Sequence, residues 1–258
     1  MKRRSGHCRV LLAAAALGAL LLPFATPAQD TKQNRDEAAA INTELAIGYM
    51  REENLAAARD KIDKALEQNP HTARTQMVAG FVYDRLGEKR KATRHYDEAV
   101  RLAKGDPDVL NNAGAYFCRV GQYKRGEELL LQAAASALYR TPAAAYANAG
   151  RCARSDGRPQ EAEQYFRKAL SINPKQADAL LQMAEIAQGH GNGLQARAFL
   201  ERYDAVAPAT AASLWLGRSI ELGLGDTAQA AHYARRLRDE FPTSEETAKL
   251  LQEDRKQP

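Results

Sequence analysis

Two cysteines are the side chains with the clearest chemical potential in this sequence. Cys118 and Cys152 are separated by 33 residues, and neither belongs to a C-x-x-C motif of the kind that activates a thiol. In an oxidising compartment, an even pair on adjacent elements predicts a structural disulfide, which would stabilise the fold by about 3 kcal/mol. The alternative is that both are small, buried apolar residues.

The remaining chemistry-bearing residues do not assemble into a catalytic or metal site. His95, His190 and His232 fall on separate segments without a companion at metal-ligand spacing. The glycine-rich run 189–193 resembles a phosphate cradle in isolation, but its place in the repeat described below favours a plain inter-helix turn. No zinc-protease, phosphate-loop or nucleophile-elbow motif occurs. We therefore expect no enzymatic activity and no cofactor.

The N-terminus predicts export. Lys2, Arg3, Arg4 and Arg9 accompany an apolar run over 10–25 that is too short for a comfortable membrane span, and small residues follow it. This pattern is typical of a cleavable secretory signal peptide, assigned to residues 1–28. Cys8 precedes the apolar run and no cysteine follows the run directly, so the sequence shows no clear lipobox. Without the four basic residues, 33 Lys and Arg nearly balance 32 Asp and Glu, and a net charge of +1 gives no reason to expect a nucleic-acid partner.

Both cysteines lie on a repeated unit. The segments 110–121 (LNNAGAYFCRVG) and 146–157 (YANAGRCARSDG) share a large residue, an Asn, a small pair ending in Gly and a closing Gly. Taking the closing glycine as position 15, the same position recurs along the chain in steps of 34, 34, 36, 34 and 34. This period predicts helical hairpins of the tetratricopeptide type. The position is occupied by Glu53, Gly87, Gly121, Gly157, Gly191 and Gly225.

Small residues at two other positions support the same frame. Position 20, where the two helices of a hairpin approach most closely, is Ala or Gly in all six units, and position 8 is Ala or Gly in five. The sixth unit departs from the pattern, with Arg218 at position 8, as terminal repeats do when they cap a stack.

We therefore predict an all-α fold: a right-handed superhelical solenoid of six tetratricopeptide (TPR) hairpins with a C-terminal capping helix. A flexible lead at 29–38 would precede the hairpins, and the capping helix and tail would occupy 243–258. The six repeats within 39–242 are expected at 39–72, 73–106, 107–142, 143–176, 177–210 and 211–242.

The first helices of such hairpins line a concave groove, and the residues there indicate what it binds. The first two repeats would present apolar side chains, including two methionines, which suit an adaptable peptide groove. The alternative is that the lead segment or a neighbouring repeat covers them. Arginines would make the middle basic, either as a solvated face or as a site for an acidic segment. The candidate groove residues are Thr43, Ile47, Met50, Met77, Phe81, Arg85, Asn111, Arg119, Arg151 and Arg154.

The chain resembles the type IV pilus biogenesis/stability protein family PilF/PilW. The likeness extends over about 36–251 and rests on the motifs at 111–118, 148–152 and 162–170, together with Ala-Leu-Leu-Gln-Met-Ala at 179–184 and Leu-Trp-Leu-Gly-Arg at 214–218. The paired cysteines and the Leu-Trp-Leu-Gly stretch are not part of the generic repeat consensus.

The resemblance implies a non-catalytic pilotin in the periplasm, associated with the outer membrane. Its partner would be the pilus secretin PilQ, whose outer-membrane localisation and multimerisation it would promote, together with other pilus-assembly proteins. Membrane association would be indirect, since the sequence shows no clear lipobox. The alternative function is a general periplasmic TPR scaffold for peptidoglycan-linked or polysaccharide-export machinery that uses the basic groove.

Overall fold

The computed structural model describes residues 27–255, and within them every regular element is a helix. The expected signal peptide lies outside this range except for its last two residues. The first helices of the hairpins are α1 (Pro27–Arg51), α3 (Ala73–Arg85), α5 (Pro107–Arg119), α7 (Pro142–Ser155), α9 (Ala177–Gly189) and α11 (Ala211–Leu224). Their partners are α2 (Leu55–Gln68), α4 (Lys89–Leu102), α6 (Tyr123–Ala135), α8 (Pro159–Ile172), α10 (Gly193–Asp204) and α12 (Thr227–Glu240). The last helix, α13 (Glu245–Asp254), follows the sixth hairpin.

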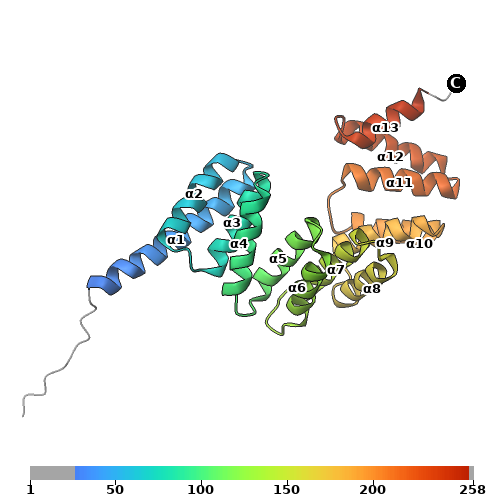
Figure 1. Ribbon diagram of the computed structural model, residues 1–258. Helices are drawn as coiled ribbons and strands as arrows, with labels where there is room; N and C mark the ends of the chain where they lie inside the picture. Colours follow the sequence, from blue (N-terminus) through green and yellow to red (C-terminus); the bar gives the residue numbers. More distant parts are fainter. Residues whose placement is uncertain (1–26, 256–258) are drawn as a thin grey trace, which may run out of the picture.

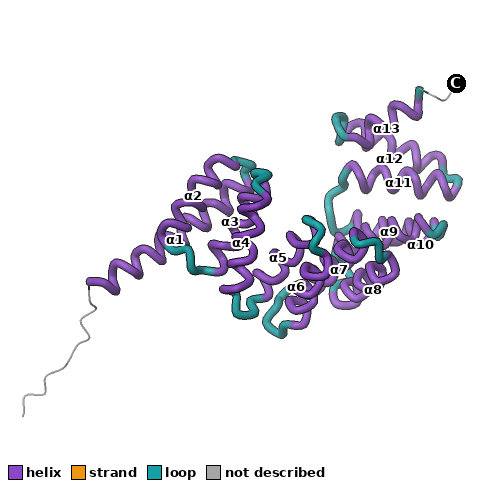
Figure 2. Tube along the Cα trace, viewed as in Figure 1, coloured by secondary structure: helices purple, strands orange, loops and turns teal. Residues whose placement is uncertain are grey.

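The hairpins stack in chain order, and the two ends of the molecule lie far apart (Figure 1). Each helix packs mainly on its neighbours in the sequence, and the first helices also contact one another along the stack, as α1 does α3 and α5 does α7. Short loops join all the helices (Figure 2). The predicted solenoid of six hairpins with a capping helix is confirmed. No helix in the described range has the length and apolarity to cross a membrane.

The tight turn inside each hairpin depends on a left-handed residue at repeat position 15. The φ angle is +76° at Gly87 and +85° at Gly121, a conformation that glycine adopts without a steric penalty. In the first repeat Glu53 takes this place with φ of +57°, at a cost that glycine would avoid. The period read from the sequence therefore reflects a backbone requirement of the turn.

Glycine at position 8 lets an aromatic ring or another large side chain pack against the backbone of the first helix. A Cβ on Gly80 would lie 2.7 Å from the ring of Tyr96, and one on Gly150 would lie 2.6 Å from Phe166. In the sixth repeat the glycine at the close approach is Gly217, 2.7 Å from Tyr233 by the same measure. Arg218, the residue at frame position 8, instead pairs with Glu253 of α13 at 2.8 Å.

Residues 29–38, expected as a flexible lead, form part of α1 instead. The segment from Asp36 is rich in Ala and Glu, which favour helix. Two contacts hold this part of α1 against the end of α2. Asn69 donates a hydrogen bond to Asp36 at 2.7 Å, and Arg35 donates one to the carbonyl of Glu67 at 3.3 Å.

The capping helix closes the C-terminal end of the stack. Its N-cap, Ser244, accepts a hydrogen bond from the backbone N–H of Thr247, and two glutamates in the first turn complement the helix dipole. Leu250 of α13 is buried in the core that the helix shares with the last hairpins. Trp215 is half-buried in the same terminal core, with the Arg218 guanidinium 5.2 Å from its ring centre. This arrangement makes Trp215 a packing residue of the cap.

Candidate partner-binding groove

Polar side chains connect each first helix to the next along the concave face. Arg74 of α3 bonds Glu44 of α1, with 2.8 Å from its Nε to the carboxylate. Asn148 of α7 donates a hydrogen bond to Asn111 of α5 at 2.9 Å. Gln188 of α9 reaches the carbonyl of Ser219 in α11. With Arg119–Asp84 between α5 and α3 and Arg154–Glu185 between α7 and α9, these contacts link the first helices of all six repeats into one face.

Two of the expected groove residues belong to the core. Thr43 is 1% exposed, and its hydroxyl contacts the carbonyl of Ala39 and, at 3.0 Å, the hydroxyl of Thr75. Met50 is 6% exposed and packs in the cluster that joins the first three repeats. The expectation that they line the groove is wrong, because this side of α1 turns toward α2 and α3.

The exposed apolar residues of α1 are ones that the repeat frame did not indicate. Ile41 is 54% exposed and Leu45 is 43% exposed. They are four residues apart, so they lie on one side of the helix. The relevant signal was this i, i+4 aliphatic pair in a first repeat that has no preceding hairpin to cover it.

Phe81 is the most open apolar residue among the groove candidates. It is 42% exposed on α3, while Met77 one turn earlier and Ile47 on α1 are partly buried against the core. Arg85, one turn beyond Phe81, is exposed and has no ion pair among the described residues. Phe81 and Arg85 therefore offer a partner an aromatic face and a free guanidinium side by side.

The arginines in the middle of the groove do not make it basic. Arg119 pairs with Asp84 of α3. Arg154 bonds both Gln182 and Glu185 of α9. These two positive charges are matched by carboxylates from other repeats, so among the groove arginines Arg85 is the one without a carboxylate partner in the described residues.

Arg151 makes a similar bridge between repeats four and five. It bonds Asn148 on its own helix and lies 3.4 Å from the carboxylate of Asp178 on α9. Since both side chains of this ion pair are about half exposed, it contributes little to stability. Its effect is to orient Arg151 along the groove.

The cysteines meet beneath the groove. Cys118 of α5 and Cys152 of α7 form a disulfide with their Cα atoms 5.2 Å apart, so the structure brings together the predicted pair. Above the disulfide is a cavity of about 280 Å³ lined by Ala115, Cys118, Arg119, Asn148, Arg151, Cys152 and Ser155. Asn111 reaches this region through its hydrogen bond with Asn148.

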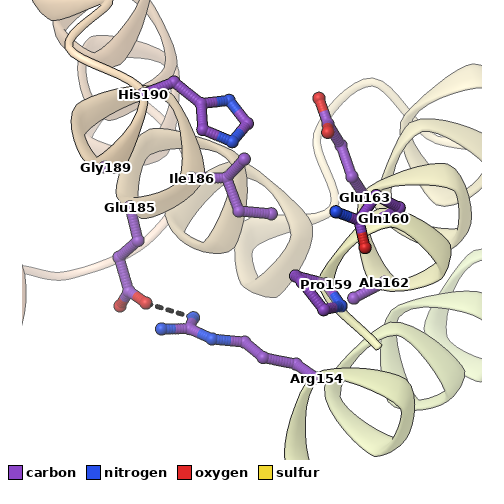
Figure 3. A pocket seen from close by; sticks show the side chains of 9 residues that line it. All are labelled: Arg154, Pro159, Gln160, Ala162, Glu163, Glu185, Ile186, Gly189 and His190. Atoms are coloured by element: carbon purple, nitrogen blue, oxygen red, sulfur yellow. Dashed lines mark hydrogen bonds and ion pairs between the residues drawn. The ribbon is translucent and has the colours of Figure 1, made fainter. Parts of the chain in front are cut away.

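A second cavity, of about 340 Å³, lies between the fourth and fifth repeats. In Figure 3 the side chains of Gln160 and Glu163 on α8 face Ile186 and His190 across it. The Arg154–Glu185 pair closes one side, and Ile186 is its apolar wall. The lining combines both charges with the apolar side chains of Ile186, Ala162 and Pro159, so it does not select one ligand class.

The contacts of His95 and of the glycine-rich run 189–193 indicate structural roles. Nδ1 of His95 lies 2.7 Å from Oε1 of Gln76, and burial, aided by the nearby charge of Arg94, lowers the pKa of His95. Gly189 ends α9 and Gly193 begins α10, with Gly191 at φ +75° between them, which confirms the inter-helix turn. Among the residues described, no three His, Cys, Asp or Glu side chains are grouped to hold a metal ion.

Models of the tetratricopeptide repeat match residues 43–107, 107–175, 153–216 and 211–244. The chain is a tetratricopeptide-repeat protein. Among other tetratricopeptide-repeat proteins, the type IV pilus assembly protein PilF of Pseudomonas aeruginosa is 28% identical over 214 residues, which are 83% of this chain and 85% of PilF.

Two solved structures extend the likeness of this tetratricopeptide-repeat protein to its fold. P. aeruginosa PilF matches with a TM-score of 0.72 and 27% identity, covering 85% of this chain and 99% of PilF. PilW, described as a widely conserved type IV pilus biogenesis factor, matches with a TM-score of 0.72 and 28% identity, covering 83% of this chain and 98% of PilW. The resemblance to PilF and PilW inferred from the sequence motifs is confirmed.

Proposed function

We propose that this protein is a pilotin of type IV pilus biogenesis, a non-catalytic scaffold that binds other proteins. It acts in the periplasm at the outer membrane, after export by a signal peptide at residues 1–28. Its partner is the pilus secretin PilQ, whose outer-membrane localisation and multimerisation it promotes. Pilus assembly and twitching motility depend on this step.

The observation that carries the proposal is the extent of the likeness to PilF and PilW. The match covers nearly all of those two solved chains and most of this one, so it extends well beyond a single repeat. Many solenoids share the repeat itself. Agreement over most of the stack supports a shared role more strongly than a match to one repeat would.

The groove around Phe81 is the surface we assign to the secretin segment. Burying the exposed ring of Phe81, together with the accessible edges of Met77 and Ile47, favours association through apolar contact. Arg85 supplies a charge for a carboxylate on the same segment. Arg119, Arg151 and Arg154 already have partners, so they hold the groove in shape and contribute less to charge attraction.

The alternative role, a scaffold for peptidoglycan-linked or polysaccharide-export machinery, depended on a basic groove. Since carboxylates from other repeats neutralise Arg119, Arg151 and Arg154, a single unpaired groove arginine, Arg85, gives that role little support.

The test is the state of the secretin in a strain that lacks this protein. We expect heat-resistant secretin multimers to disappear from the outer membrane, and to return when the wild-type chain is supplied. Phe81→Ser combined with Arg85→Ser should fail to restore them. Leu194→Ser is the matched control, because Leu194 is 72% exposed on α10, away from the groove.

Unchanged multimers in the deletion strain would refute the proposed function. Full rescue by the Phe81/Arg85 variant would leave the pilotin role standing and refute the groove assignment. Circular dichroism and thermal unfolding of each purified variant check that the stack remains folded.

A further inference from the structure

Three exposed aliphatic side chains lie near the junctions between successive repeats. Leu138 is 85% exposed, Ile172 is 42% exposed and Val206 is 36% exposed. They are spaced at 34-residue intervals, and each lies five residues before the expected start of the next repeat. Ile172 ends α8, while Leu138 and Val206 lie in the connections that follow α6 and α10. All three therefore lie where one repeat joins the next, on one edge of the stack. We call this set the aliphatic edge.

One contact ties the second and third members of the aliphatic edge together. Arg202, one helical turn before Val206, donates a hydrogen bond to the carbonyl of Pro174, two residues after Ile172, at 2.9 Å. The end of α10 therefore rests on the loop that follows α8. Aliphatic side chains exposed to water near adjacent repeat junctions favour a partner that removes them from water.

The charges beside the aliphatic edge are mostly positive and are not neutralised. Arg140 follows Leu138 by two residues, and Lys168 and Lys175 flank Ile172. None of these three has a carboxylate partner in the described part of the chain, in contrast to the arginines of the groove. Glu201 and Asp204 lie near Val206, so the positive charge is concentrated around Leu138 and Ile172.

The shape of the edge favours a soft planar partner over a peptide. Leu138, Ile172 and Val206 line neither of the cavities described above, and the exposure of Leu138 makes it a protruding side chain. A peptide is normally held in a groove, with hydrogen bonds to its backbone. Protruding aliphatic chains beside unpaired Lys and Arg instead match the acyl boundary and phosphate layer of a membrane.

We propose that the aliphatic edge rests on the surface of an anionic lipid bilayer. Leu138, Ile172 and Val206 enter the boundary between head groups and acyl chains, while Arg140, Lys168 and Lys175 contact lipid phosphates. This proposal does not depend on the pilus function, and it leaves the groove free for a protein.

The test is sedimentation of the exported, processed protein with lipid vesicles. Vesicles that contain phosphatidylglycerol should bind it, and pure phosphatidylcholine vesicles should bind it much less. Leu138→Ser/Ile172→Ser/Val206→Ser should lower the partition coefficient about tenfold, because the aliphatic contribution is lost. Lys168→Glu/Lys175→Glu should lower it by a similar factor and reduce its sensitivity to salt, with Arg140 left as the remaining cation.

Leu194→Ser/Leu222→Ser is the matched control, since these leucines are 72% and 46% exposed but lie beside the turns inside hairpins. It should bind vesicles like the wild type. Failure of the wild type to bind anionic vesicles would overturn the proposal, as would equal losses in the control and the edge variant. The charge-reversal variant changes only exposed residues, so it tests the proposal even if the triple variant misfolds. If the wild type does not bind vesicles and the triple variant loses pilus assembly, the proposal is wrong and the aliphatic edge contacts a protein.

Discussion

Arg197 and Glu221 form a bidentate ion pair that joins repeat five to repeat six. The guanidinium of Arg197 on α10 donates from Nε at 2.9 Å and from Nη2 to the two carboxylate oxygens of Glu221 on α11. The Glu221 side chain is 4% exposed. A nearly buried carboxylate depends on such a partner, because it cannot be solvated by bulk water.

The Arg197–Glu221 pair predicts an asymmetry between single and double variants. Arg197→Ala should lower the thermal midpoint clearly, because it leaves the Glu221 charge buried without its partner. Adding Glu221→Gln should recover part of the loss, since the neutral amide costs less to bury. Lys249→Ala, which breaks an exposed pair with Glu245, should have almost no effect. Equal midpoints for the single and double variants would contradict this account.

The Cys118–Cys152 disulfide predicts a redox-dependent stability. Reduction, or Cys118→Ser/Cys152→Ser, should lower the free energy of unfolding by about 3 kcal/mol, because the unfolded chain regains the freedom of the closed loop. Urea unfolding with and without dithiothreitol measures the change. Dithiothreitol should leave the double variant unaffected. Identical midpoints for the oxidised and reduced wild type would contradict the prediction.

We expect Gly126, beside the disulfide, to tolerate no larger side chain. A Cβ there would lie 2.3 Å from Sγ of Cys118 and 2.7 Å from the carbonyl oxygen of Gly114. Gly126→Ala should therefore destabilise the protein by about 1–3 kcal/mol through overpacking. Gly48→Ala is the matched control in α1, because nothing lies within 4 Å of its added Cβ. It should stabilise the protein by about 0.5–1 kcal/mol. Chemical denaturation of both variants checks the opposite signs.

Glu127 predicts a loss of stability in acid. Burial alone would raise its pKa, but hydrogen bonds from Arg158 and Tyr165 outweigh burial and hold the pKa below the usual 4.5. A carboxylate with a lowered pKa in the folded state stabilises the protein above its unfolded pKa. That stability is lost as pH falls below 4.5 through the lowered value.

Glu127→Gln should consequently flatten the pH dependence of the urea midpoint between pH 6 and 3. Glu245→Gln is the comparison, since Glu245 is an exposed carboxylate near the C-terminal end. A Glu127→Gln profile as steep as that of the wild type would show that other carboxylates dominate acid unfolding.

The repeat period allowed the hairpins and their turns to be predicted, because each depends on a local backbone need. It also placed the two cysteines on neighbouring first helices. Gly121 is required by the left-handed turn, and the small residue at position 8 is required by close packing. Groove exposure was less predictable, because it depends on how each helix rotates against its neighbours. Thr43 faces α3, while Ile41 faces solvent, although both occur in the same amphipathic stretch.

The repeat pattern also could not predict the ion pairs between distant residues. Arg119 and Asp84 are 35 residues apart, and neither occupies a position that the repeat consensus constrains. In the sixth repeat the close approach uses Gly217, one residue before the frame position, because the contact with α12 depends on helix rotation as well as on counting residues.

The covalent link between repeats three and four also has a mechanical consequence. In this stack each hairpin contacts mainly its neighbours, so the molecule can bend a little at every junction between repeats. The disulfide stiffens the central junction, so bending is concentrated in the two arms on either side. A load applied to the N-terminal arm would then be transmitted through a rigid hub before it reached the C-terminal one.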